Sequence, residues 1–168
     1  MQLLERVKNC NGCGACVVAC KKNCVKMYGR DSEEARQLLG RLSDKQDMEG
    51  KKPVPVVDEG GCDRCNACVL FCPLYNPVEL PVFDEWYEYS EAFEGRDMPK
   101  LYRSTMRAAR AGQHTEFVGT LCEIAALKSL NGDKIPNNLI LKPMVCSEEK
   151  RESEPACRGC IFYLGKRI

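Results

Sequence analysis

Eight of the thirteen cysteines fall into two strings with the same spacing, and these strings are the part of the sequence best suited to chemistry. Each string reads C-x2-C-x2-C-x3-C; the members are Cys10, Cys13, Cys16 and Cys20, then Cys62, Cys65, Cys68 and Cys72. Two-residue gaps let a tight loop place three thiolates around one metal centre, and this spacing is typical of iron–sulfur clusters. Zinc is the alternative, because C-x2-C pairs also build zinc ribbons. Two quartets with a matching x3 interval favour clusters over zinc.

The residues between the cysteines differ between the two strings. Gly12 and Gly14 lie inside the first string, where glycine tolerates unusual backbone angles and permits close approach of the backbone. The second string is more polar at the corresponding places, with Asp63, Arg64 and Asn66. In both loops we expect backbone N–H groups to point at the cysteine sulfurs.

The two strings resemble those of bacterial-type ferredoxins with two [4Fe–4S] clusters, and the resemblance covers about residues 6–80. It implies a pseudo-twofold β/α sandwich in which the fourth cysteine of each string binds the cluster of the other string. One cluster would be bound by Cys10, Cys13, Cys16 and Cys72, and the other by Cys62, Cys65, Cys68 and Cys20. The chain departs from the family where Lys21 replaces the proline expected after Cys20, and where a long insertion separates the two halves.

That insertion, about residues 29–53, is predicted to be helical and to lie between two extended segments. Residues 24–28 are strand-like, and residues 53–57 are extended because each proline biases the residue before it toward β geometry. Asp31 is the expected N-cap of the helix, with Glu34 at the capping-box position. The apolar residues that follow at helical spacing are Ala35, Leu38, Leu39 and Leu42.

The expected fold class is α+β, with a two-cluster ferredoxin-like domain in residues 1–80 and a small, mostly helical C-terminal module in residues 99–168. Residues 81–98 between them are aromatic and acidic. We expect this segment to form an extended arm or short helix that packs its aromatic rings on a neighbour.

Within the C-terminal module the sequence predicts two helices and a strand. The first helix should have Pro99 in its first turn and end near residue 110. The second should cover about residues 115–130 and stop at the Asn131-Gly132 pair. A short strand is expected at residues 139–141, and a polar loop from residue 147 until Cys157.

Five cysteines lie outside the two strings. Cys24 follows a candidate ligand by four residues and is expected to be a buried, small apolar side chain near a cluster. Cys157 and Cys160 form a C-x2-C pair, which with Cys122 and Cys146 makes a candidate third site for a [4Fe–4S] cluster or zinc. The alternatives for these four are a redox-active dithiol or inert thiols.

A weaker resemblance links residues 101–160 to the beta subunits of coenzyme F420-reducing hydrogenases and formate dehydrogenases. These families join ferredoxin motifs to a flavin-containing region and carry a later C-x2-C pair. The matching stretches in this chain are Gly119-Thr120-Leu121, Ala125-Ala126-Leu127, Asn131-Gly132, Ile135 and Leu139-Ile140-Leu141. Because Glu116-Phe117 stand where the family has paired glycines, we do not expect bound flavin.

Charge and composition restrict the classes of function. The 25 basic and 24 acidic residues leave almost no net charge, and the short basic stretches lack interleaved aromatic residues, which disfavours nucleic-acid binding. No run approaches the ~18 apolar residues of a membrane span, and no signal peptide precedes Glu5 and Arg6. An odd number of cysteines in such a chain argues against a disulfide framework and indicates a reducing, anaerobic cytoplasm.

The resulting hypothesis is a non-catalytic electron-transfer subunit of an anaerobic oxidoreductase complex. It would relay single electrons between a catalytic subunit and a redox carrier, since the sequence has no phosphate-binding glycine loop and only one histidine, His114. One alternative is a degenerate flavin-type beta subunit of an F420-, hydrogen- or formate-linked oxidoreductase. Another is a redox accessory protein that activates a second enzyme.

Overall fold

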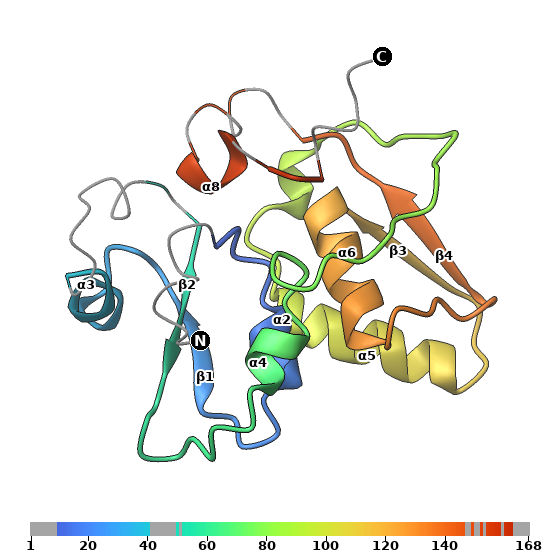
Figure 1. Ribbon diagram of the computed structural model, residues 1–168. Coiled ribbons are helices and arrows are strands. Elements are labelled where there is room, and N and C mark those ends of the chain that lie inside the picture. The colour runs from blue at the N-terminus through green and yellow to red at the C-terminus, as the bar shows by residue number, and fades with distance from the viewer. Residues whose placement is uncertain are drawn as a thin grey trace.

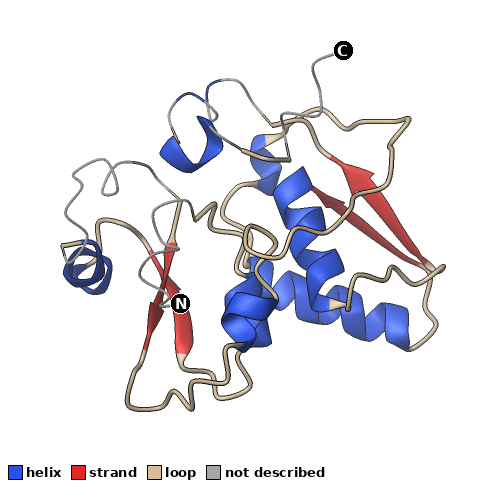
Figure 2. Cartoon of the chain, viewed as in Figure 1, coloured by secondary structure: helices blue, strands red, loops and turns tan. Residues whose placement is uncertain are grey.

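The computed structural model describes residues 10–40, 50, 52–146, 149, 152, 154–158 and 160–162. The described residues form an α+β fold with two two-stranded sheets (Figures 1 and 2). The elements in chain order are α2 (Ala15–Ala19), β1 (Val25–Tyr28), α3 (Glu33–Leu39), β2 (Val54–Val57), α4 (Ala67–Leu70), η2 (Glu91–Phe93), α5 (Met98–Arg110), β3 (Thr115–Gly119), α6 (Leu121–Leu130), β4 (Leu139–Pro143) and α8 (Pro155–Arg158).

The strands β1 and β2 pair antiparallel and close the insertion between the two cysteine strings. Val25 lies opposite Val57, and Tyr28 lies opposite Val54. This pairing confirms the extended segments expected at residues 24–28 and 53–57. Helix α3 packs against the sheet through Ala35 and Leu39, which share a small core with Val54.

The helix of the insertion begins one residue later than the sequence indicated. The prediction of Asp31 as N-cap is wrong, because the side chain of Ser32 accepts the hydrogen bond from the N–H of Ala35 at 3.1 Å. Serine is as good an N-cap as aspartate. The helix begins after Ser32 because the Ser32 hydroxyl, three residues before Ala35, accepts from a free N–H of the first turn. Leu42, expected on the apolar face of this helix, lies outside the described residues.

Helix α5 agrees with the sequence prediction. Asp97 is the N-cap and accepts a hydrogen bond from the N–H of Lys100, and Pro99 lies in the first turn, where its missing N–H leaves no intrahelical bond unmade. The face that carries Met98, Tyr102 and Ala109 is buried.

The second predicted helix is wrong over its first turn. Residues 115–119 form the strand β3, and the helix α6 begins only at Leu121. Thr120 caps this helix in a capping box: its side chain accepts from the backbone N–H of Glu123, and the Glu123 carboxylate accepts from the N–H of Thr120. The apolar residues Phe117 and Val118 are compatible with both the helical and the strand periodicity. The capping box is the sequence signal that shows where the strand ends and the helix begins.

The C-terminal module contains a β–α–β unit. Strand β3 pairs parallel with β4, with Thr115 opposite Leu139 and Gly119 opposite Pro143, and α6 connects them. The expected strand at residues 139–141 is therefore confirmed and extends to Pro143. The prediction of a polar loop from residue 147 until Cys157 is wrong where it can be checked, because Glu149 and Glu152 are helical and α8 begins at Pro155. Residues 147, 148, 150, 151 and 153 lie outside the described residues.

The segment of residues 81–98 is mostly irregular, with the short 3-10 helix η2. Phe83 packs against the main core and makes an edge contact with Trp86 at 6.0 Å between ring centroids. Tyr87 bridges to Met144, next to the end of β4. The expectation that this segment packs aromatic rings on a neighbour agrees with these contacts.

The main core joins the first cysteine string to the C-terminal module. It contains Cys13 and Ala15 together with Tyr102 of α5, Phe117 of β3 and Ile124 of α6. Helix α2 accordingly lies beside α5 and α6 (Figure 1). In the described part of the chain no helix is both long and apolar enough to span a membrane.

Candidate metal sites

The two cysteine loops have the same backbone conformation. In each loop the residue before the second cysteine and the residue after it have positive φ. In the first loop these are Gly12 at 72° and Gly14 at 77°, and in the second loop they are Arg64 at 58° and Asn66 at 59°. Arginine rarely adopts this left-handed conformation, so its presence in the second loop indicates that the loop shape is required.

An equivalent side-chain hydrogen bond closes both loops. The Oδ1 atom of Asn11 accepts from the N–H of Cys13 at 3.2 Å, and the Oδ1 atom of Asp63 accepts from the N–H of Cys65 at 3.1 Å. These are Asx turns, which hold the second cysteine of each string in the same relation to the first. The hydrogen bond with Cys65 is also the main cause that lowers the pKa of Asp63.

Backbone N–H groups point at cysteine sulfurs, as expected. The N–H of Gly12 donates to Cys10 Sγ at 3.4 Å, and the N–H of Arg64 donates to Cys62 Sγ at 3.4 Å. Such hydrogen bonds stabilise negative charge on sulfur and therefore favour the thiolate, the form of cysteine that binds a metal.

Each loop leads directly into a short helix that carries the third cysteine. Gly14 is the N-cap of α2 and Asn66 is the N-cap of α4, both in the left-handed conformation. Cys16 and Cys68 are therefore the second residues of equivalent helices. Because α2 packs against α4, the two strings lie side by side.

The first three cysteines of the second string and the last cysteine of the first string line one cavity. This cavity has a volume of about 780 Å³, and the cysteines that line it are Cys20, Cys24, Cys62, Cys65 and Cys68. Four of these are the expected ligands of the second cluster, with Cys20 contributed by the first half of the repeat. The structure thus brings together Cys20, Cys62, Cys65 and Cys68, the crossed set that the resemblance to ferredoxins implied for the second cluster.

Cys24 lies against this set, where a buried small side chain was expected. It is 7% exposed, and its Sγ lies 3.3 Å from Cys20 Sγ. The hydrogen bond to Cys20 and then burial raise the pKa of Cys24 to about 12. Burial alone would raise the pKa of Cys20, but hydrogen bonds from the Cys24 thiol and nearby backbone N–H groups lower it overall. The pair therefore favours a Cys20 thiolate with Cys24 as the donor.

The first string forms a more enclosed group. Cys13 and Cys16 are buried and Cys10 is partly buried. Burial and then the charge of Cys10 raise the pKa of Cys13. Cys72, the expected fourth ligand, follows Phe71, which packs against the same core as Cys13.

Two buried polar atoms near the first string have no hydrogen-bond partner among the described residues. They are Asn11 Nδ2 in the first cysteine loop and the hydroxyl of Tyr102 in α5, which interacts with the charges of Cys13 and Cys122. A buried donor without a partner costs about 1–3 kcal/mol. Both are donors, and thiolate or sulfide sulfur is the acceptor that an iron–sulfur cluster would supply beside them. The donor set and these two atoms therefore fit such a cluster.

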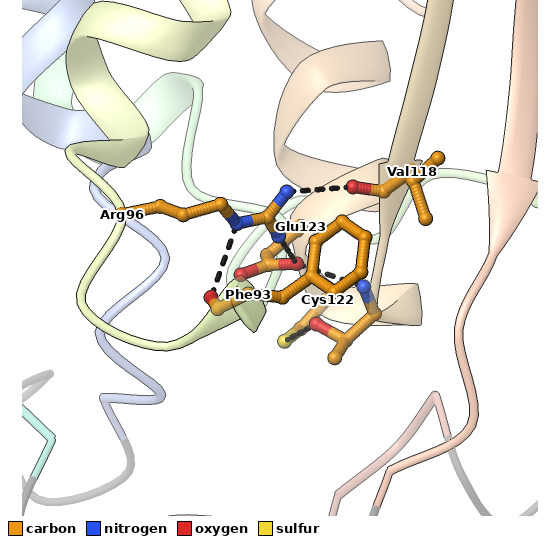
Figure 3. Close-up of polar contacts among 6 residues, drawn as sticks. Phe93, Arg96, Val118, Cys122 and Glu123 are labelled. Carbon is orange, nitrogen blue, oxygen red and sulfur yellow. Dashed lines mark hydrogen bonds and ion pairs between the residues drawn. The ribbon is translucent and has the colours of Figure 1, made fainter. Parts of the chain in front are cut away.

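The other four-cysteine group begins at the N-terminus of α6. Cys122 is the second residue of this helix, and its Sγ lies 3.1 Å from Thr120 Oγ1 (Figure 3). Arg96 fixes this turn: its guanidinium donates to the Val118 carbonyl at 2.8 Å and pairs with Glu123 at 3.0 Å. Burial raises the pKa of Cys122 to about 12.

The remaining members of this group come from beyond β4. Cys146 interacts electrostatically with Cys157 and Cys160, and the side chain of Lys52 interacts with Cys122, Cys146 and Cys157. The sequence pattern identified the four cysteines but missed Lys52, Tyr102 and Arg96. These three are distant in sequence from any motif, and no signal in the sequence distinguishes them from surface or core residues.

None of the thirteen cysteines, all of which lie in described residues, forms a disulfide bond. Among the residues described, no three His, Cys, Asp or Glu side chains are arranged to hold a single metal ion. A cubane cluster has a different requirement, because each thiolate binds a different iron atom.

Residues 9–76 match the family model described as 4Fe-4S dicluster domain. No curated protein and no solved structure matches the chain. The comparisons therefore do not support the similarity of residues 101–160 to the beta subunits of F420-reducing hydrogenases and formate dehydrogenases. The chain contains an iron–sulfur domain of the ferredoxin type at residues 9–76, and this domain supports a role in electron transfer.

Proposed function

We propose that the chain is a non-catalytic subunit that relays single electrons between a catalytic oxidoreductase partner and a redox carrier. The observation that supports this most directly is the cavity in which Cys20 meets Cys62, Cys65 and Cys68. Thiolates from both halves of a sequence repeat enclose this space, as crossed cluster binding requires.

Two [4Fe–4S] clusters would be held by the crossed sets, Cys10, Cys13, Cys16 and Cys72, and Cys62, Cys65, Cys68 and Cys20. When bound, each would supply one-electron redox chemistry. The chain's own contribution is to orient the thiolates, to direct N–H groups at sulfur and to exclude water. Asn11 and Asp63 hold the loops in register, and the Cys24 thiol donates to Cys20.

The two sets differ in exposure, which suggests a direction for the relay. Cys65 is exposed, whereas Cys13 and Cys16 are buried, and Cys13 packs in the core that the first string shares with the C-terminal module. Electron exchange with a carrier falls steeply with distance, so the side of Cys65 is the side at which a carrier would dock. The buried set would then face the partner through the module.

The proposal is tested by stopped-flow mixing under anaerobic conditions. Dithionite-reduced protein, freed of excess dithionite, is mixed with cytochrome c as a one-electron acceptor. We expect recovery of the visible cluster absorbance and reduction of cytochrome c to proceed together. Absorbance that dithionite does not change, or reduced protein that delivers no electrons, would contradict the relay.

Cys65→Ser tests the assignment of the exposed side. Because it removes an exposed ligand of the second set, we expect fewer electrons delivered and slower exchange with cytochrome c. The matched control is Cys24→Ser, which alters a neighbouring thiol outside both sets and should leave the number of electrons unchanged. Equal electron delivery by both variants and the unaltered protein would show that Cys65 is not a ligand.

The partner is tested by anaerobic purification from the native source. A stoichiometric complex with a catalytic oxidoreductase subunit is expected for a relay subunit. Purification of the chain alone, with only transient binding to the enzyme that depends on it, would instead indicate an activating accessory protein.

A further inference from the structure

The four C-terminal cysteines converge because of the topology of the β–α–β unit. Strands β3 and β4 are parallel, and the N–H of Met144 donates to the Gly119 carbonyl at 2.8 Å. The segment after β4 therefore lies beside the turn into α6. This brings Cys146 next to Cys122, and the interaction of Cys146 with Cys157 and Cys160 completes the group.

Lys52, which lies just before β2, also belongs to this group. Its backbone N–H donates to the buried carboxylate of Glu154 at 3.4 Å, and its ammonium group donates to Cys157. The same ammonium group interacts with the charges of Cys122 and Cys146. Figure 1 shows the chain entering β2 close to α8, in agreement with the Lys52–Glu154 hydrogen bond. A partly buried cation beside three of the four thiols supplies counter-charge to a thiolate-bound metal centre.

Tyr102 links this group to the first cysteine string. It is fully buried, and it interacts with the charges of both Cys13 and Cys122, which also interact with each other. Its buried hydroxyl has no hydrogen-bond partner among the described residues. We therefore infer that an acceptor lies between the first cysteine string and the C-terminal cysteines. The group thus neighbours the buried end of the ferredoxin-type domain rather than standing apart from it.

We propose that Cys122, Cys146, Cys157 and Cys160 bind a third [4Fe–4S] cluster, with the Lys52 ammonium group paired to its thiolates. Four thiol protons leave as four iron–thiolate bonds form. This site would extend the proposed electron relay from the buried first set into the C-terminal module. The role of the third cluster therefore rests on the proposed function. Zinc would fill the same thiolates without serving as an electron carrier.

The first test counts metal in the full-length chain, purified without oxygen, and in Cys157→Ala/Cys160→Ala. We expect about twelve irons per chain in the unaltered protein and about eight in the double variant, with sulfide falling in parallel. The matched control is Cys65→Ser, which should also lose iron but from the second set, so its reduced EPR spectrum should differ from that of the double variant.

The outcomes separate this proposal from the relay itself. About eight irons with one zinc, or about eight with no further metal, would overturn the third cluster while leaving the relay intact. About twelve irons retained by the double variant would also overturn it. An absence of iron from the unaltered chain would instead overturn the relay.

Lys52→Met provides a test that removes no ligand. The variant keeps the length of the side chain but loses its charge, so we expect full iron content and a more negative potential for one cluster only, measured by EPR-monitored redox titration. Lys52→Arg should restore the potential. Unchanged potentials in Lys52→Met would show that no cluster lies beside this ammonium group, even if the cysteine double variant fails to fold.

Discussion

At the scale of single residues, Asn11 and Asp63 make equivalent loop hydrogen bonds but differ in charge. Hydrogen bonding with Cys65 lowers the pKa of Asp63, so this residue is ionised at neutral pH. A carboxylate next to a cluster disfavours added negative charge, and therefore disfavours reduction. The two loops thus provide the same geometry with different electrostatic surroundings.

Exchanging these two residues should shift the two potentials in opposite directions. Asn11→Asp keeps the acceptor for the Cys13 N–H and adds a charge, so the first cluster should become harder to reduce. Asp63→Asn removes a charge, so the second should become easier to reduce. Redox titration followed by EPR checks both, and iron content serves as the control. Shifts of the same sign in the two variants would contradict the assignment.

Cys24 should be unreactive in the native protein. Its pKa is raised to about 12 by the hydrogen bond to Cys20 and by burial, and only the thiolate is nucleophilic. Because the folded-state pKa is raised, raising the pH from 7 to 9 should leave the thiol protonated and its alkylation by iodoacetamide negligible. Mass spectrometry of the digested protein measures this, with denatured protein as the control. Rapid modification of Cys24 at pH 8 would be inconsistent with this environment.

At the scale of elements, the left-handed N-caps of α2 and α4 set the geometry of the loops, and Gly14 is the more constrained of the two. Its φ is 77°, and a Cβ atom there would lie 3.0 Å from Pro99 Cδ. The glycine therefore serves both the turn into α2 and its contact with α5. Asn66 occupies the equivalent turn of α4 with a side chain present.

Gly14→Ala should destabilise the protein more than an equivalent change in open space. The left-handed conformation costs a non-glycine residue about 1–2 kcal/mol, and crowding against Pro99 adds to this. Gly112→Ala is the matched control, because its φ is 78° and no atom lies within 4 Å of the added Cβ. The Tm of the holoprotein should fall further in Gly14→Ala than in Gly112→Ala. Equal losses would mean that α2 and α5 do not constrain each other here.

The elements that the sequence predicted correctly are those with strong local signals. Prolines predicted the extended start of β2 and the first turn of α5. The strand-like residues 24–28, which follow the first cysteine string, predicted β1. The error at residues 115–119 arose because Phe117 and Val118 continue the helical spacing of α6 backward. The Thr120–Glu123 capping box, present in the sequence, was the evidence for a later start.

At the scale of the whole molecule, the chain is organised around thiols contributed by distant segments. Cysteine spacing identified the eight candidate ligands of the two strings, and the resemblance to ferredoxins implied the crossed set around Cys20, whose members line one cavity. The position of Lys52 among the C-terminal cysteines could not be predicted, since it depends on how the insertion meets α8. Cys13 and Tyr102 likewise lie in one core because of tertiary packing, which local sequence patterns do not predict.

Metal and sulfide analysis of the chain purified without oxygen, combined with EPR after dithionite reduction, decides whether these thiols bind iron–sulfur clusters. We expect brown protein with at least about eight irons and eight sulfides per chain, and spectra of interacting reduced clusters. Colourless protein whose cysteines hold zinc, with no EPR signal after reduction, would contradict cluster binding.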